Sequence, residues 1–351
     1  MYNNCMALNK VGSFFGLDIG TTAVRVVELA HSGNGWNLQK YSIQPIDEKT
    51  SKSSSDSDRK VLGEAILSAV NQAGIKTKDV AIGIPSQRMF ASVIEVPNVS
   101  KTELNATIKY QAENYVPMKV DEAKIDWAII GESPNDPTKA EVLIASVLNQ
   151  FTEERLDLLE GIGLNVVAIE PDSLALTRAL LPGGVTNGRM ILDIGDSATD
   201  LIMTIGTAPR LIRSIPVGFK SLVYATQQNL RIDQQQAQRL LLSFGLDQDK
   251  VEGQLVRALS ATLEQLNAEI QKSLKFFSSK YPGVHVESIL ASGYMTVIPN
   301  LLYTISQSVG LVGQATTPWQ HVNVPASEQA RIAPVSSQFA VAVGLAERLG
   351  F

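Results

Sequence analysis

Two short segments of the chain carry residue types suited to holding a phosphorylated ligand. Residues 16–27 read GLDIGTTAVRVV, and residues 191–203 read ILDIGDSATDLIM. Each is an apolar run that ends in Asp-Ile-Gly, followed by a turn of small hydroxyl or acidic residues and a second apolar run. The pattern predicts two β-hairpins about half a chain length apart, and therefore one ligand gripped between two related halves.

The turns of these hairpins offer donors for phosphate oxygens. Gly20 and Gly195 allow backbone conformations closed to other residues and a close approach of the main chain to a ligand. Consecutive amides in such a turn form an anion-binding nest. Thr21, Thr22 and Thr199 add short hydroxyl donors.

The aspartates that precede the turns fit a metal ion better than a bare phosphate. Asp18 and Asp193 would repel phosphate oxygens, but they can lie beside a hydrated Mg²⁺ that neutralises them, since Mg²⁺ keeps several waters and needs few carboxylates. The alternative is two ordinary hairpins whose Asp and Gly residues serve only the turns. The recurrence in matching halves favours the shared ligand.

Composition narrows the class of protein. A length of 351 residues predicts about two domains. The net charge of −5 argues against nucleic acid as the main partner. The one cysteine, Cys5, excludes an intramolecular disulfide and a cysteine zinc cluster and suits a reducing cytoplasm. No apolar run approaches the ~20 residues that span a bilayer, so we expect membrane association only through a partner.

The order of predicted elements indicates an α/β protein with an insertion. Residues 47–60 are polar and serine-rich and predict an exposed loop before a helix at 61–73. Apolar residues at helical spacing predict a long helix over 254–280, and residues 313–334 contain proline and are expected to be irregular. The segment 86–165 predicts strand, helix, strand, strand, helix, a small α+β module whose first helix begins near Ser100. We expect a first domain at 12–85 plus 166–186, the module at 86–165, and a second domain at 187–351 with 213–288 as its smaller subdomain.

Several segments resemble a known family. The two hairpins, EPDSLALTRAL at 170–180 and ILASGYM at 289–295 follow the order of the actin-like ATPase superfamily. The segments at 95–130 and 213–222, together with the ending FAVAVGLAERLG, resemble more narrowly the PilM family of type IV pilus assembly proteins, related to FtsA. The resemblance implies an actin-like fold, with two related RNase H-like domains around a nucleotide cleft.

The resemblance also implies a function and a location. It suggests an ATP- and Mg²⁺-binding scaffold, at most a slow ATPase, in the cytoplasm at the inner face of the cell membrane. Its partner would be the cytoplasmic N-terminal tail of a PilN-like membrane protein, docked near the inserted module. Links to PilO and the pilus motor ATPases would be indirect, and self-association is possible in such a family.

The resemblance assigns individual residues of this chain to the expected site. Asp18, Gly20, Thr21, Thr22 and Arg25 match the first phosphate hairpin, and Asp193, Gly195 and Thr199 match the second. Glu170 matches a position that can orient a metal-bound water. Gly218 matches a glycine that approaches the phosphates, and Gly293 matches a turn beside the adenosine.

Three positions depart from the superfamily pattern. Tyr294 follows Gly293 where a second glycine is usual, Phe219 replaces the second glycine of a pair, and Leu241 stands where relatives often carry lysine. These departures concern adenine recognition more than phosphate binding.

Two other functions stay open at this point. A small-molecule kinase of the same fold would need a carboxylate base, for which Asp126 is the one candidate in the module. An FtsA-like filament-forming division protein is compatible with the module, but the C-terminal sequence shows no basic amphipathic extension.

Overall fold

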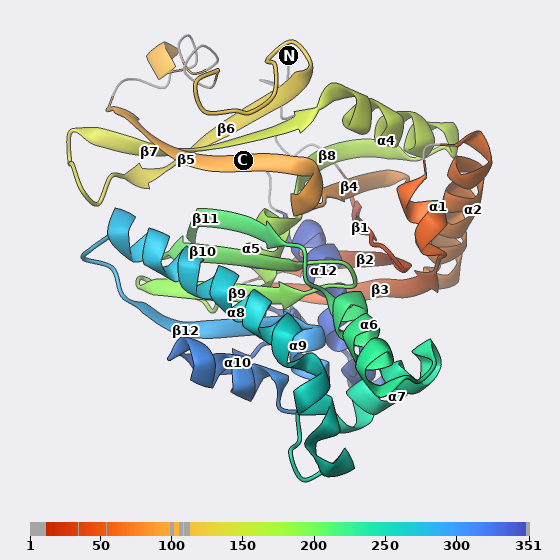
Figure 1. Ribbon diagram of the computed structural model, residues 1–351. Helices are drawn as coiled ribbons and strands as arrows, with labels where there is room; N and C mark the ends of the chain where they lie inside the picture. Colours follow the sequence, from red (N-terminus) through yellow and green to blue (C-terminus); the bar gives the residue numbers. More distant parts are fainter. Residues whose placement is uncertain are drawn as a thin grey trace.

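The computed structural model describes residues 12–348 except 34, 54, 99–101, 105–107 and 109–112. These residues form two large sheets, a smaller inserted sheet, and helices around them (Figure 1). In order across the sheet, the first sheet contains β14 (Val322–Asn323), β3 (Gly35–Pro45), β2 (Ala23–Ser32), β1 (Phe15–Ile19), β4 (Asp79–Ile84) and β8 (Asn165–Pro171).

The second sheet repeats the topology of the first. Its order is β11 (Ala208–Ile215), β10 (Thr199–Ile205), β9 (Gly188–Ile194), β12 (Val286–Gly293) and β13 (Val312–Ala315). In both sheets three antiparallel strands are followed by strands parallel to the first strand of the unit. The two halves of the chain are therefore built on one repeated unit, and β1–β2 corresponds to β9–β10.

Two helices lie between the large sheets, α5 (Asp172–Leu180) and α12 (Ala340–Ala346). One hydrophobic core joins them to inward-facing side chains of both sheets, among them Val27 of β2 and Ile191 of β9. The helices approach closely, because a Cβ on Gly344 would lie 2.0 Å from the carbonyl oxygen of Ala175. Any larger residue there would force the helices apart.

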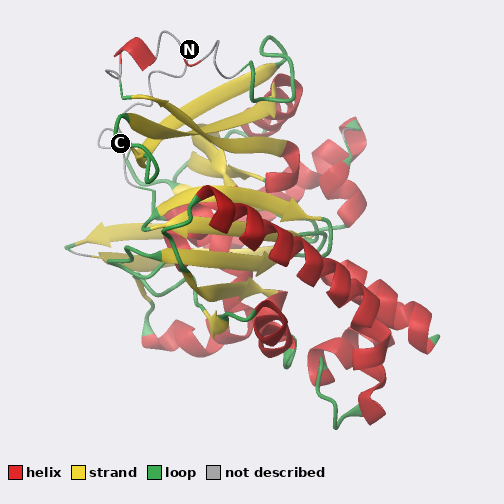
Figure 2. Ribbon diagram, turned by 60° about the vertical axis from the view of Figure 1, so that its left-hand side comes forward, coloured by secondary structure: helices red, strands yellow, loops and turns green. Residues whose placement is uncertain are grey.

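The outer faces of the large sheets are covered by further helices (Figure 2). The strands alternate: Val24 and Val26 pack outward against the helices, whereas Val27 and Leu29 face the central core. The first sheet is covered by α2 (Asp56–Ala73) and α4 (Asn149–Gly161), and the second half carries α6 (Phe219–Leu230), α7 (Gln234–Phe244), η3 (Val251–Gly253), α8 (Gln254–Lys280), α9 (Tyr294–Val297) and α10 (Leu301–Val309).

The inserted sheet follows β4 through the short helix η2 (Ser86–Arg88). Its antiparallel strands lie in the order β5 (Met89–Pro97), β7 (Lys139–Leu148), β6 (Ala123–Glu132), which agrees with the strands expected in this segment. The expected helix that begins near Ser100 falls mostly outside the described residues. Figure 1 shows the inserted strands beside β11 of the second half.

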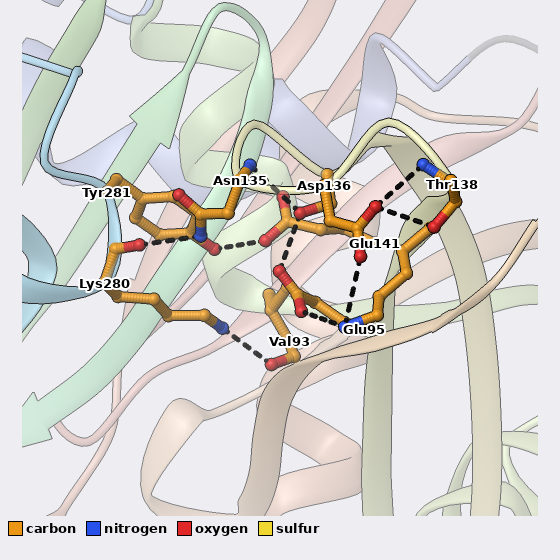
Figure 3. A network of polar contacts seen from close by, with 10 residues as sticks. Val93, Glu95, Asn135, Asp136, Thr138, Glu141, Lys280 and Tyr281 are labelled. Atoms are coloured by element: carbon orange, nitrogen blue, oxygen red, sulfur yellow. Dashed lines mark hydrogen bonds and ion pairs between the residues drawn. The ribbon is translucent and has the colours of Figure 1, made fainter.

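A buried polar network fastens this sheet to the second half (Figure 3). Glu141 of β7 is fully buried and accepts a hydrogen bond of 2.6 Å from the Tyr281 hydroxyl. Its other oxygen lies 2.5 Å from Nε of Arg210. Lys280 donates to the carbonyl of Val93, 2.9 Å away. The module is thus held to the second half by charge and hydrogen bonds.

Two expectations about loops are wrong. Residues 47–60 do not form a loop but contain helix α1 (Glu48–Lys52) and the first turn of α2, with Asp47 and Ser55 as their N-caps. The stretch 313–334, which reads as irregular, contributes β14 and α11 (Ala326–Ile332), before η4 (Ala333–Phe339) leads into α12.

Candidate functional site

The turns of the two repeated hairpins meet. The hydroxyl of Thr22 in the β1–β2 turn donates to Oδ2 of Asp196 in the β9–β10 turn, 2.6 Å away. The hydroxyls of Thr21 and Ser197 lie 3.4 Å apart. Residues more than 170 positions apart are thus in direct contact, as expected for halves that close over one ligand.

Both turns are closed in the same way. The amide of Gly20 donates to the carbonyl of Ala23 at 3.0 Å, and the amide of Gly195 donates to the carbonyl of Ala198 at 2.9 Å. A Cβ on Gly20 would lie 2.7 Å from Nη1 of Arg25, so glycine there makes room for the guanidinium. The turns therefore share the Asp-Ile-Gly sequence and the closing hydrogen bond. Neither Gly20 nor Gly195 has a positive φ, so the expectation that they adopt a conformation closed to other residues is wrong.

One cavity of about 860 Å³ runs along the contact between the turns. Its volume is within the range of small-molecule sites. The expected site residues that line it are Asp18, Gly20, Thr21, Arg25, Asp193, Gly195 and Gly293. Thr22 reaches its edge through Asp196, which is also part of the lining.

Three expected site residues lie elsewhere. The hydroxyl of Thr199 is fully buried and donates to the carbonyl of Val217 at 2.6 Å. Gly218 packs behind the second turn, where a Cβ would lie 2.5 Å from the amide nitrogen of Ala198. Glu170 is held in the core by Arg178, at 2.7 Å, and by Arg348, at 2.6 Å. Both of its oxygens are engaged there, so the structure does not bring Glu170 to the cavity as the resemblance implied.

Carboxylates gather on one wall of the cavity. Asp18 lies opposite Arg25 in the first hairpin, and their side chains form an ion pair of 3.1 Å. At the corresponding positions of the second hairpin, Asp193 lies opposite Asp200. Asp172, in the first turn of α5, completes the group. The cluster is strongly negative, with Arg25 as its one cation among the described lining residues of the two hairpins.

The environment of this cluster disfavours its charged form. Burial, reinforced by Asp200, raises the pKa of Asp193 to about 7. Burial raises the pKa of Asp200 to about 6. The pKa of Asp172 is raised well above its usual value by burial and then by Asp18 and the other carboxylates. A cation placed among these groups would relieve that cost.

These residues fit a magnesium–nucleotide ligand. The glycine turns offer amides to phosphate oxygens, and the carboxylate wall offers acceptors to the waters of a metal ion. Within the described part of the chain, no group of three or more His, Cys, Asp or Glu side chains is arranged to bind a metal directly. A metal held through water and phosphate oxygens agrees with that arrangement. Nε of Arg25 is buried and has no hydrogen-bond partner among the described atoms.

Two of the residues that depart from the superfamily pattern, Phe219 and Tyr294, contact each other. The rings of Phe219 and Tyr294 stack in parallel, with centroids 4.0 Å apart and 4° between their planes. The Tyr294 hydroxyl donates to Oδ1 of Asp196 at 3.1 Å. Asp196 therefore receives hydroxyls from Tyr294 and from Thr22 of the other half. A carboxylate occupies a position between the turns that suits an anion.

Gly293 lines the cavity, but its own backbone also requires glycine. It has a φ of +62°, and a Cβ would lie 2.3 Å from the carbonyl oxygen of Ile194. A larger residue would strain the junction of β12 and β9 before it met any ligand. Asp126, the candidate base of a kinase, is exposed on β6 and is not part of the cavity lining.

Sequence reasoning missed several functional candidates. Asp200 could have been found by superposing the two hairpins, since Asp18 and Arg25 have the same spacing as Asp193 and Asp200. Asp172 carries a weaker signal, an acid in the first turn of a helix. No pattern in the sequence predicted the contact of Asp196 with Tyr294.

None of the helices in the described residues combines the length and apolar character needed to cross a membrane. The site therefore lies in a protein whose described part contains no membrane-spanning helix.

Comparison with known proteins identifies the family and the fold. A family model described as type IV pilus assembly protein PilM matches residues 16–349. A solved structure described as a PilM–PilN type IV pilus biogenesis complex has a TM-score of 0.80 at 22% identity and covers 95% of this chain and 97% of its own. The ethanolamine utilization protein EutJ from Carboxydothermus hydrogenoformans has a TM-score of 0.53 at 13% identity, with 95% and 89% covered. The fold is the actin-like ATPase fold, and the chain belongs to the PilM family of type IV pilus assembly proteins.

Proposed function

We propose that this protein is an ATP-binding scaffold of the type IV pilus assembly platform. The observation that carries the proposal is the direct contact between two matching Asp-Ile-Gly turns across one cavity. Such a pair of turns offers main-chain amides to one set of phosphates from both sides. Membership in the PilM family supplies the context of pilus assembly.

Residues of the cavity have separate roles in this proposal. The turn residues that follow Gly20 and Gly195, Thr21 among them, provide donors to the phosphates, because the amides of the two glycines themselves donate to Ala23 and Ala198. Asp18 and Asp193 accept from the waters of Mg²⁺, which supplies the positive charge that neutralises both the phosphates and the carboxylate wall. Thr199 and Gly218 act indirectly, because they fix the second turn from behind.

We propose that hydrolysis is slow or absent. Rapid phosphoryl transfer to water needs a positioned water and cations around the transferred group. Arg25 forms an ion pair with Asp18, and Glu170 forms ion pairs with two arginines. Asp172 is a carboxylate of the cavity wall, but among the described residues of the two hairpins that line the cavity, Arg25 is the one cation. ATP would then act by favouring the closed arrangement of the two halves.

The proposed partner is the cytoplasmic tail of a PilN-like membrane protein. The similar structure described as a PilM–PilN complex supports this choice. Through that tail the protein would lie at the cytoplasmic face of the inner membrane, with indirect links to PilO and to the motor ATPases. The domain division at 86–165 would then separate a partner-facing module from the nucleotide-binding halves.

Calorimetric titration with MgATP tests the nucleotide site. Asp18→Asn and Asp193→Asn should each weaken binding at least tenfold, because each removes a carboxylate from the metal side. Asp126→Asn is the matched control, since Asp126 is exposed on β6 outside the cavity lining. Unchanged affinity in both cavity variants would show that the metal is held elsewhere.

A further inference from the structure

The lining of the same cavity also contains a basic group of residues that lies outside the two hairpins. Arg59 of α2, Arg88 of η2 and Arg155 of α4 line it together with Phe151. The guanidinium groups of Arg88 and Arg155 lie over the Phe151 ring, 5.8 and 5.4 Å from its centroid. We call Arg59, Arg88 and Arg155 the arginine triad.

The positive charge of the triad is not balanced by ion pairs. None of its three members forms a salt bridge with a carboxylate in the part of the chain that the structure describes. Arg59 donates to the carbonyl oxygen of Glu154 at 3.4 Å, and Arg155 donates to that of Ser51 at 3.5 Å. Burial and then the neighbouring Arg88 lower the pKa of Arg155, and Glu154 in the same lining offsets only part of this shift. An anion between the arginines would oppose the shift.

We infer that the arginine triad binds an acidic side chain of the partner's cytoplasmic tail. This inference rests on the proposed function, because it assigns one subsite to the proposed PilN-like peptide. It goes further in naming the chemical group that is recognised and the three residues that recognise it.

The surroundings of the triad favour a carboxylate on a peptide over a phosphate. Guanidinium groups match carboxylates by paired N–H donors, and the contacts with the Phe151 ring help to position two of them. Leu148, which is 46% exposed, belongs to the same lining as Phe151. A peptide with neighbouring apolar and acidic side chains satisfies both features. The phosphates of a nucleotide already have donors at the glycine turns.

One residue joins the triad to the phosphate hairpin. Ser51 of α1 accepts from Arg155 through its carbonyl oxygen, and its hydroxyl donates to the carbonyl oxygen of Thr21 at 3.0 Å. A peptide that fixes the position of Arg155 would therefore also affect the first turn through Ser51. This path gives the peptide and the nucleotide a physical means of affecting each other's affinity.

Binding of a synthetic peptide tests the inference. The probe copies the cytoplasmic tail of the PilN-like protein from the same organism, and a second peptide replaces its Asp and Glu residues by Asn and Gln. Affinities are measured for the full-length protein and for Arg88→Gln and Arg155→Gln. Arg239→Gln is the control, because Arg239 is exposed on α7. Arg155→Lys tests the paired donors, and circular dichroism checks that each variant is folded.

We expect each triad variant to weaken binding of the native peptide at least tenfold, with little effect on the neutralised peptide and none from Arg239→Gln. Arg155→Lys should restore only part of the affinity.

If the normal protein binds the native peptide but the triad variants bind it equally well, the inference is wrong and the proposed function survives. If the normal protein binds neither peptide, both fail. If 10 mM inorganic phosphate displaces the peptide at constant ionic strength, the subsite is selective for phosphate and the choice of carboxylate is wrong.

Discussion

At the scale of single residues, Asp196 is the group on which the two halves meet. It accepts hydroxyls from Thr22 and Tyr294, in a position where a phosphate oxygen could accept the same donors. Its negative charge would oppose the phosphates of the proposed nucleotide. The contact between the two halves is therefore held partly by a carboxylate that lies at the proposed phosphate site.

Asp196→Ser should strengthen MgATP binding about fivefold. Removing one like charge near the phosphates is worth about 1 kcal/mol in a water-exposed setting. Titration calorimetry measures the change, with Asp126→Asn as the charge-matched control. Weakening as large as that expected for Asp193→Asn would instead show that Asp196 holds the metal.

Glu347, which lies outside the cavity lining, should make the free energy of unfolding depend on pH. Its side chain is buried, and burial raises its pKa to about 8 although Arg178 opposes the shift. The folded protein therefore keeps a proton on Glu347 that the unfolded chain releases near pH 4.5. The free energy of unfolding should fall as pH rises from about 4.5 to about 8.

Glu347→Gln should remove this pH dependence. We expect the variant to be about 2 to 4 kcal/mol more stable than the normal protein at pH 9 and nearly equal to it at pH 5. Urea unfolding at both pH values measures the difference. Glu264→Gln, an exposed change on α8, should have no such effect. A variant that is less stable at pH 9 would mean that the carboxylate is ionised and stabilised in the fold.

At the scale of elements, the inserted sheet depends on the network around Glu141. Glu141→Ala should lower the free energy of unfolding by about 3 to 5 kcal/mol, because it leaves Arg210 buried without its partner. Tyr281→Phe removes one hydrogen bond and should cost about 1 to 3 kcal/mol. Lys139→Ala, in the more exposed pair with Glu95, should cost less than about 1 kcal/mol. Equal losses in all three variants would contradict this ranking.

The elements differ in how well the sequence predicted them. Long periodic segments were predicted correctly, such as 254–280, which forms α8, because one face is continuously apolar. The serine-rich stretch at 47–60 was predicted wrongly, because α1 and the start of α2 depend on caps by Asp47 and Ser55 and not on apolar spacing. Ser51 then acquires a role in joining two ends of the cavity that no local pattern could indicate.

The sequence predicted only the part of the candidate site that depends on local residues. The Asp-Ile-Gly repeat located both turns, since turn chemistry is local. The position of Glu170 in an ion-pair cluster, the stacking of Phe219 on Tyr294 and the assembly of the arginine triad depend on residues distant in sequence. Such contacts follow from packing of the two halves, which periodicity does not specify.

At the scale of the whole molecule, α1 connects three parts. Its Glu48 pairs with Lys220 of α6 in the second half, and its Ser51 contacts both Thr21 and Arg155. If this helix transmits binding, MgATP and the tail peptide must change each other's affinity by the same factor.

Ser51→Ala should reduce that shared factor. The variant loses the hydroxyl bond to Thr21 but keeps the carbonyl that Arg155 contacts, so peptide affinity without nucleotide should be nearly normal. We expect the increase in peptide affinity on addition of MgATP to shrink at least threefold. Peptide titrations with and without MgATP measure it, and Ser260→Ala on the exposed face of α8 is the control. An unaltered factor would exclude Ser51 as the connection.

The most direct test is a crystal structure of the protein grown with MgATP. We expect one nucleotide whose phosphates lie within hydrogen-bond distance of main-chain amides from both the Gly20 turn and the Gly195 turn, with Mg²⁺ on the side of Asp18 and Asp193. A nucleotide that touches only one of the turns, or that binds outside their common cavity, would contradict it.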